Sequence, residues 1–182
     1  IAHHYTPLSL VVRAARQAET LAKNRYGRNA LVVTVMRRSG EQTRVGCHWH
    51  YDSLTSTPEA QPIALFSRFY ELFKRDVLSP KCLYILLEEA TTLIGLERAA
   101  QSSEIKRVLR RQRADDQKDQ LPDDQIQHLA DNITRLAEAM DNEHNGKERA
   151  IELHADQLRY GLVETLGWLL VAEFLTRKGQ HE

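Results

Sequence analysis

Cysteine, proline and glycine are all scarce in this sequence. Its 182 residues include only 2 cysteines, 5 prolines and 8 glycines. Cys47 and Cys82 lie far apart, so they form neither a disulfide framework nor the paired spacing of a zinc module. This cysteine usage favours a reducing, cytoplasmic setting.

Long uninterrupted hydrophobic runs are also missing. The longest apolar stretch, Leu162–Leu175, contains Glu164 and Glu173 and is shorter than the roughly 20 residues that a membrane-spanning helix needs. The chain begins at Ile1 without a charged segment followed by an apolar one, so we expect no signal peptide. We therefore expect no membrane partner.

Neither sign of charge dominates overall, but the two signs are unevenly distributed. Residues 1–50 carry eight Lys and Arg residues against only Glu19 and Glu41. This asymmetry is consistent with an anionic ligand at the basic first part and a protein-facing role for the acidic remainder. Two ordinary solvated surfaces would explain it equally well.

The first fifty residues have the pattern of a strand end, a helix and a β-hairpin. Thr6 suits a helix cap, Pro7 suits the first helical position, and Gly27 suits a left-handed helix stop. Two β-rich runs at 30–36 and 43–49 follow. Because two strands make a narrow sheet, we interpret this part as the remainder of a larger α/β domain. The buried stripe predicted for the helix is Leu8, Val11, Val12, Ala15, Ala18 and Ala22.

The segment 15–29 reads A-R-Q-A-E-T-L-A-K-N-R-Y-G-R-N and resembles the closing helix of GGDEF-type nucleotide cyclase domains. It departs from that pattern at Arg16, where those cyclases favour an acid, and by one extra residue between Lys23 and Gly27. The opening I-A-H-H-Y-T-P-L and the later V-M-R-R-S-G-E narrow the match. Together they resemble the large subunit of type III-B (Cmr) CRISPR effector complexes, strongly over Ile1–Trp49 and more loosely beyond.

The resemblance implies a mainly α fold with a small α+β part. Residues 1–52 would be the C-terminal strand–helix–hairpin of a ferredoxin-like (GGDEF/palm-type) domain, and residues 53–182 an all-α helical bundle domain. The parent would make cyclic oligoadenylate from ATP with divalent metal when target RNA is bound. Cleavage of single-stranded DNA is a second activity that the resemblance implies for this family. The family's G-G-D-D hairpin does not occur here, so we expect this chain alone to be inactive, with no cofactor.

Lys23 and Arg28 are the candidate nucleotide-binding residues. A helix end with two cations beside a strand edge is suited to phosphates, although a plain helix cap and a solvated loop residue are the simpler interpretation. By resemblance, Lys23 contacts the ATP triphosphate and Arg28 is the weaker candidate. We predict no catalytic residue and no metal site, because the pairs His3–His4 and His48/His50 lack the spacing of a zinc module.

From Pro62 onward the pattern is helical throughout. We predict a linker at Asp52–Gln61, a mobile connection at Ala114–Asp124 and a loop at Asn142–Gly146. The last helix, from about Lys147 to Arg177, is the most apolar and should form the centre of the bundle. The stripe predicted to be buried on the first helix of this part is Ile63, Phe66, Phe69, Tyr70 and Phe73.

A concentrated basic run, R-V-L-R-R-Q-R, ends at Arg113. Arg107, Arg110 and Arg111 are weak candidates for nucleic-acid binding, since charge alone attracts phosphates. A plain surface helix is slightly favoured, because no aromatic residue is interleaved to stack a base.

Three functional hypotheses follow. In the first, the chain packs against the small helical subunit of a CRISPR complex, near the crRNA–target duplex. In the second, it is a nonenzymatic helical protein-interaction module with a remnant sheet. The third, a stand-alone diguanylate-type cyclase fragment, is disfavoured by the long helical tail.

Overall fold

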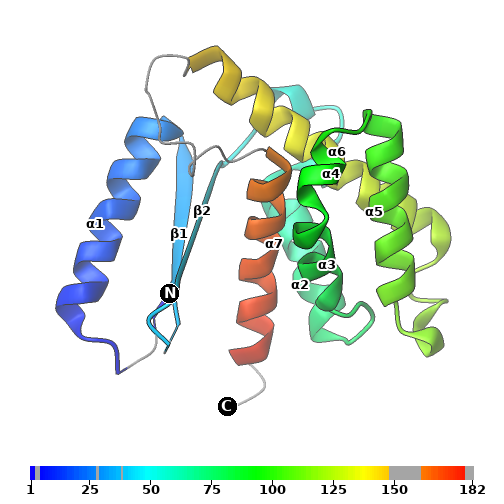
Figure 1. The fold of residues 1–182 in the computed structure, drawn as a ribbon, viewed down its shortest axis with the longest axis horizontal. Helices are drawn as coiled ribbons and strands as arrows, with labels where there is room; N and C mark the ends of the chain where they lie inside the picture. The colour runs from blue at the N-terminus through cyan, green and yellow to red at the C-terminus, as the bar shows by residue number, and fades with distance from the viewer. Residues whose placement is uncertain (3–4, 28, 38, 148–160, 179–182) are drawn as a thin grey trace. The chain divides into compact units, whose positions relative to one another are not determined.

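The structure is a computed structural model that describes residues 1–2, 5–27, 29–37, 39–147 and 161–178. The chain is mainly helical with one small antiparallel sheet, which confirms the predicted class (Figure 1). It divides into two compact units, Ile1–His50 and Tyr51–Glu182. The identity of the first unit as part of a palm stays a prediction.

The first unit contains one helix and one hairpin. α1 spans Leu8–Arg25, β1 spans Ala30–Met36, and β2 spans Gln42–His48. β1 and β2 pair antiparallel, with Val33 opposite Val45. Gly27, just after the end of α1, has a φ of 74°, which is the left-handed conformation expected for a helix stop. The start of α1 lies one residue later than predicted, because Pro7 occupies the capping position and no side chain caps the helix.

No residue of the stripe predicted on α1 is fully buried. Val11, Ala18 and Ala22 are half-buried, whereas Leu8, Val12 and Ala15 are exposed. The buried residue of this helix is Ala14, which the prediction did not include. The physical reason is the narrow sheet: α1 packs along β1, and two strands cannot cover the whole apolar face of an 18-residue helix.

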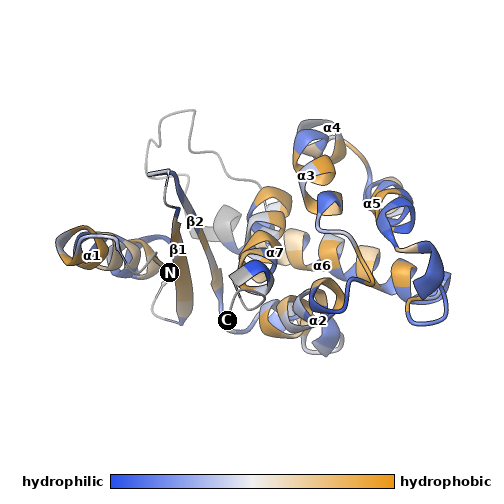
Figure 2. Ribbon diagram, turned by 90° about the horizontal axis from the view of Figure 1, so that it is seen from below, coloured by the Kyte–Doolittle hydropathy of each residue, from blue (hydrophilic) through white to orange (hydrophobic). Residues whose placement is uncertain are grey.

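The second unit is a helical bundle. α7 packs against α2, α3, α4 and α6, which confirms its predicted central place. Figure 2 colours α7 mainly orange, for hydrophobic residues. The helices are α2 (Pro62–Lys74), α3 (Lys81–Glu88), α4 (Ala90–Ile94), α5 (Arg98–Gln112), α6 (Asp123–Lys147) and α7 (Gly161–Lys178). The predicted helical residues 148–160 lie outside the described part of the chain.

Three segments expected to be irregular are structured instead. The predicted linker contains the short 3₁₀ helices η1 (Asp52–Leu54) and η2 (Pro58–Ala60), whose Leu54 and Ala60 are buried. The predicted mobile connection contains a third such helix, η3 (Asp115–Gln117). It also contains Leu121, which is completely buried. The predicted loop at 142–146 is wrong, because α6 continues through it to Lys147.

Candidate functional site

Lys23 lies in the last turn of α1, where the sequence predicts it. Its Nζ donates a hydrogen bond to Glu19 Oε1 at 2.6 Å, and both side chains are more than half exposed. This bond, together with the attraction of the same ammonium group, lowers the pKa of Glu19. The spacing of four residues on one helix face was the signal that could have identified this partner.

The other predicted phosphate contact, Arg28, lies outside the described residues. Arg25 is a second cation at the same helix end that the sequence reasoning did not select. Its guanidinium lies 5.4 Å from the centre of the Tyr26 ring, a distance suited to a cation–π contact. Tyr26 is buried and meets His48 edge to face. The aromatic ring thus connects the end of α1 to β2.

A groove of about 440 Å³ runs between α1 and β1. Lys23 does not line this groove, but its partner Glu19 does. Four alanines form the helix side of the groove and leave it wide, because their side chains are short. Its lining includes Val11, Ala14, Ala15, Ala18 and Ala22 of α1, and Leu31, Val32, Val33 and Thr34 of β1.

The described acids of the first unit do not fit a divalent metal site. Nucleotidyl transfer requires two carboxylates that share the metal, yet Glu19 lies on α1 and Glu41 in the hairpin turn. Each also faces a cation: Glu19 binds Lys23, and Glu41 lies 3.4 Å from Arg37. His3 and His4 lie outside the described residues, and no metal-dependent step is assigned to this chain.

The basic run on α5 is largely compensated by carboxylates. Arg107 bonds Glu104 at 2.6 Å and also approaches Glu89 at 3.6 Å. The bond to Glu104 raises the pKa of Arg107. Arg110 pairs with Asp123 at 3.0 Å, whereas Arg111 is exposed. Among the three arginines predicted to meet nucleic acid, only Arg111 therefore has its charge uncompensated within the described chain.

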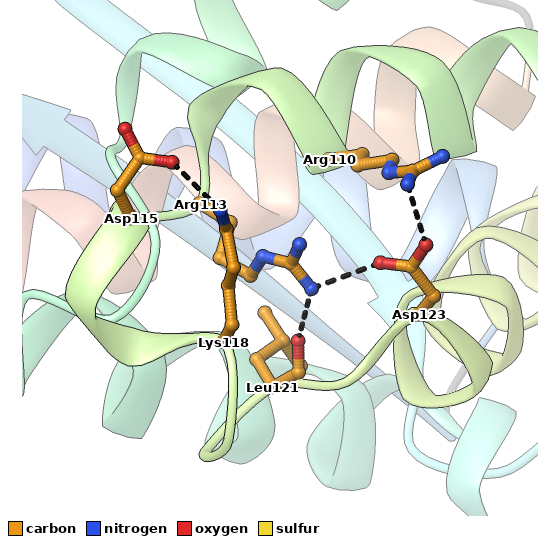
Figure 3. A network of polar contacts seen from close by, with 6 residues as sticks. All are labelled: Arg110, Arg113, Asp115, Lys118, Leu121 and Asp123. Atoms are coloured by element: carbon orange, nitrogen blue, oxygen red, sulfur yellow. Dashed lines mark hydrogen bonds and ion pairs between the residues drawn. The ribbon is translucent and has the colours of Figure 1, made fainter.

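Asp123 is shared by two arginines (Figure 3). Arg113 donates to Asp123 Oδ1 at 2.9 Å and to the main-chain oxygen of Leu121 at 2.8 Å. The Arg113 side chain is only 7% exposed, and Arg110 approaches Asp123 from the solvent side. This network fastens the end of α5 to the start of α6, so Arg113 has a structural role.

No described helix is both long and apolar enough to cross a bilayer. No protein-family model, curated protein or solved structure matches this chain.

Proposed function

We propose that this chain is the C-terminal part of the large subunit of a type III-B CRISPR interference complex. Its first unit would supply the nucleotide-phosphate side of a cyclic oligoadenylate synthase palm. Its second unit would pack against small helical subunits near the crRNA–target duplex. The sequence motifs of Ile1–Trp49 suggest this assignment.

One structural observation carries the proposal furthest. Ala2 forms a parallel bridge with Met36 at the end of β1, so α1 connects two parallel extended segments. A β-hairpin follows directly, which gives the strand–helix–hairpin order expected for the closing part of a cyclase-type palm. Lys23 lies at the end of the connecting helix, where its ammonium is suited to offset phosphate charge, although a phosphate would have to compete with Glu19 for it.

The charge pattern of α5 supports a protein-facing role for the second unit. Since Arg107 and Arg110 already pair with carboxylates, phosphates would have to compete with those ion pairs. The same observation favours the second candidate, a nonenzymatic helical interaction module. The two candidates differ in whether Lys23 serves nucleotide chemistry.

The decisive experiment measures ATP-dependent cyclic oligoadenylate synthesis by the parent polypeptide in its complex. Lys23→Ala should lower kcat/KM for ATP at least about tenfold, since losing a charged hydrogen bond costs about 1.5–3 kcal/mol. Arg13→Ala removes an exposed cation from the same helix and should change it little. A parent without an upstream G-G-D-D motif, or one unaffected by Lys23→Ala, would leave only the interaction module.

The helical unit is tested separately by co-purification with the small helical subunit encoded beside the parent. We expect a stable complex with the 182-residue chain. If the folded chain does not bind that subunit, the proposed packing role of the second unit is wrong.

A further inference from the structure

A groove of about 360 Å³ lies within the second unit, between α2 and the segment that connects η3 to α6. We call it the α2 groove. One face of α2 forms its helical wall, because residues that recur every three or four positions lie on the same side of a helix. Its volume falls within the range of ligand pockets. The groove is lined by Ser67, Arg68, Glu71, Leu72, Arg75, Val77 and Gln120.

The end of α2 gives the groove an apolar base and a charged rim. Asp76 has a φ of 54°, a left-handed conformation that is uncommon for residues other than glycine. The turn at Asp76 reverses the chain, and Val77 N–H donates to the oxygen of Leu72 at 3.0 Å. Leu72 and Val77 are 3% and 2% exposed, so they form the base. Arg75, whose side chain is 69% exposed, remains at the rim.

The polar lining of the α2 groove is rich in hydrogen-bond donors. Arg68 and Arg75 donate through their guanidinium groups, Ser67 through its hydroxyl and Gln120 through its amide. Glu71 is the one lining side chain that, when ionised, can only accept. The groove is therefore suited to a ligand that is rich in acceptors, such as carboxylates.

The charges of the two arginines are available to such a ligand. Arg68 Nη2 donates to Oε1 of the neutral Gln125 at 2.8 Å, and no described carboxylate forms an ion pair with Arg68. A carboxylate would bind this guanidinium more strongly than an amide does, because both partners are charged. Arg75 Nε lies 3.5 Å from Glu71 Oε2, and this exposed pair is weak enough to be displaced.

We infer that the α2 groove is a docking site for an acidic segment of a partner protein. One carboxylate binds Arg68, a second binds Arg75, and an apolar side chain lies over Leu72 and Val77. The two arginines are seven residues apart on α2, or about 10 Å along the helix axis, so a partner helix with two acids seven residues apart matches them. The inference rests on the protein-facing role proposed for the second unit, which both candidate functions share.

Nucleic acid fits the α2 groove less well. Glu71 lies between the two arginines on the helix and would repel a chain of phosphates. Exposed charges of both signs, on Lys74, Asp76 and Asp119, adjoin the lining residues in the sequence. The groove therefore lacks the continuous basic surface that attracts a polyanion.

An NMR titration of the 182-residue chain tests the inference. The probe is a blocked, alanine-based helical peptide that carries two glutamates seven residues apart with a leucine between them. The side-chain Nε–Hε resonances of Arg68 and Arg75 should shift saturably. A control peptide with glutamines in place of the glutamates should bind at least about fivefold more weakly, because it lacks both charges.

Four variants assign the binding to the groove. Arg68→Gln and Arg75→Gln should each weaken binding about two- to fivefold. Lys74→Gln removes a neighbouring cation that does not line the groove and should change binding little. Glu71→Gln should strengthen binding, because it removes both a repulsive charge and the competing partner of Arg75. A purely structural role for these residues would not produce tighter binding.

The inference would be overturned if the arginine resonances of the folded chain did not shift saturably, or if the glutamine peptide bound equally well. A single-stranded oligouridylate that bound the same arginines more tightly than the peptide would also overturn it, by assigning the groove to nucleic acid. Peptide binding by a chain that does not co-purify with the small helical subunit would support the docking site while the proposed packing role fails.

Discussion

Arg113 combines a permanent charge with nearly complete burial, which makes its partners important. Arg113→Ala removes the donor to the oxygen of Leu121 and to Asp123, and it leaves a buried carbonyl without that bond. We expect the free energy of unfolding to fall by about 1–3 kcal/mol. Urea denaturation followed by far-ultraviolet circular dichroism measures this change.

Arg110 provides the control, because it pairs with the same carboxylate from a side chain that is 60% exposed. Arg110→Ala should cost no more than about 1 kcal/mol, the usual limit for exposed ion pairs. Equal losses for the two variants would contradict the structural role assigned to Arg113.

Glu19 should report directly on its contact with Lys23. The hydrogen bond from Lys23 lowers the pKa of Glu19 in the folded chain. The ionised pair therefore stabilises α1 above the unfolded-state pKa of Glu19, and this contribution is lost as the pH falls through the lower folded-state pKa. Lys23→Met should move the pKa of Glu19 upward, which a carbon-13 NMR titration of its carboxylate detects. The same pKa in both proteins would show that Lys23 is oriented elsewhere.

At the scale of elements, a small network of polar side chains connects α5 and α6 across their interface. Ser102 Oγ donates to Asp131 Oδ1 at 2.5 Å, and Gln127 Nε2 donates to Ser102 Oγ at 3.1 Å and to Asp131 Oδ1 at 2.9 Å. Ser102 is 4% exposed, so water cannot readily replace its bonds. Ser102→Ala should lower the free energy of unfolding by about 1 kcal/mol.

The neighbouring Ser103 is exposed, and among the described residues its hydroxyl donates to the main-chain oxygen of Ala99 in its own helix. Ser103→Ala should leave stability unchanged or raise it slightly, because alanine favours helix more than serine does. Thermal unfolding of both variants measures the difference. If Ser103→Ala lowered the free energy of unfolding as much as Ser102→Ala, the polar network between α5 and α6 would have no special role in stability.

The hydrophobic pattern predicted where helices form more reliably than which face they bury. On α2, Phe69 and Phe73 are buried as predicted, but Ile63 is 41% exposed and Leu65 and Leu72 are buried instead. Both sets recur at helical spacing, so the apolar arc is too wide for periodicity to select one face. The partner helices select it, since α2 packs mainly against α7.

Polar segments were wrongly predicted to be irregular where tertiary packing outweighs local propensity. The letters N-E-H-N-G at 142–146 predicted a loop, yet α6 continues through them. Likewise, the side chain of Gln61 holds the two ends of the predicted linker together through hydrogen bonds to the main chain of Tyr51. Its side chain accepts from Tyr51 N at 3.0 Å and donates to Tyr51 O at 2.9 Å. Contacts between distant residues such as Arg113 and Asp123 leave no comparable signal in a single sequence.

At the scale of the molecule, the two units differ in how completely each covers its own apolar surface and pairs its own main-chain groups. The first has an open strand edge, a groove and a half-covered helix stripe. The second surrounds its most apolar helix with four others, and its Trp168 donates to the main-chain oxygen of Pro62 at 2.9 Å. A two-stranded sheet with one helix is marginal in water, whereas a bundle with a central helix can fold independently.

We therefore expect residues 51–182 to fold without the first unit. The truncated chain should retain helical circular dichroism and a cooperative thermal transition, because the contacts of α7 with α2, α3, α4 and α6 all lie within it. Residues 1–50 alone should remain unfolded or aggregate through the open edge of β1. Loss of the cooperative transition in the 51–182 chain would mean that the bundle depends on the first unit for its core.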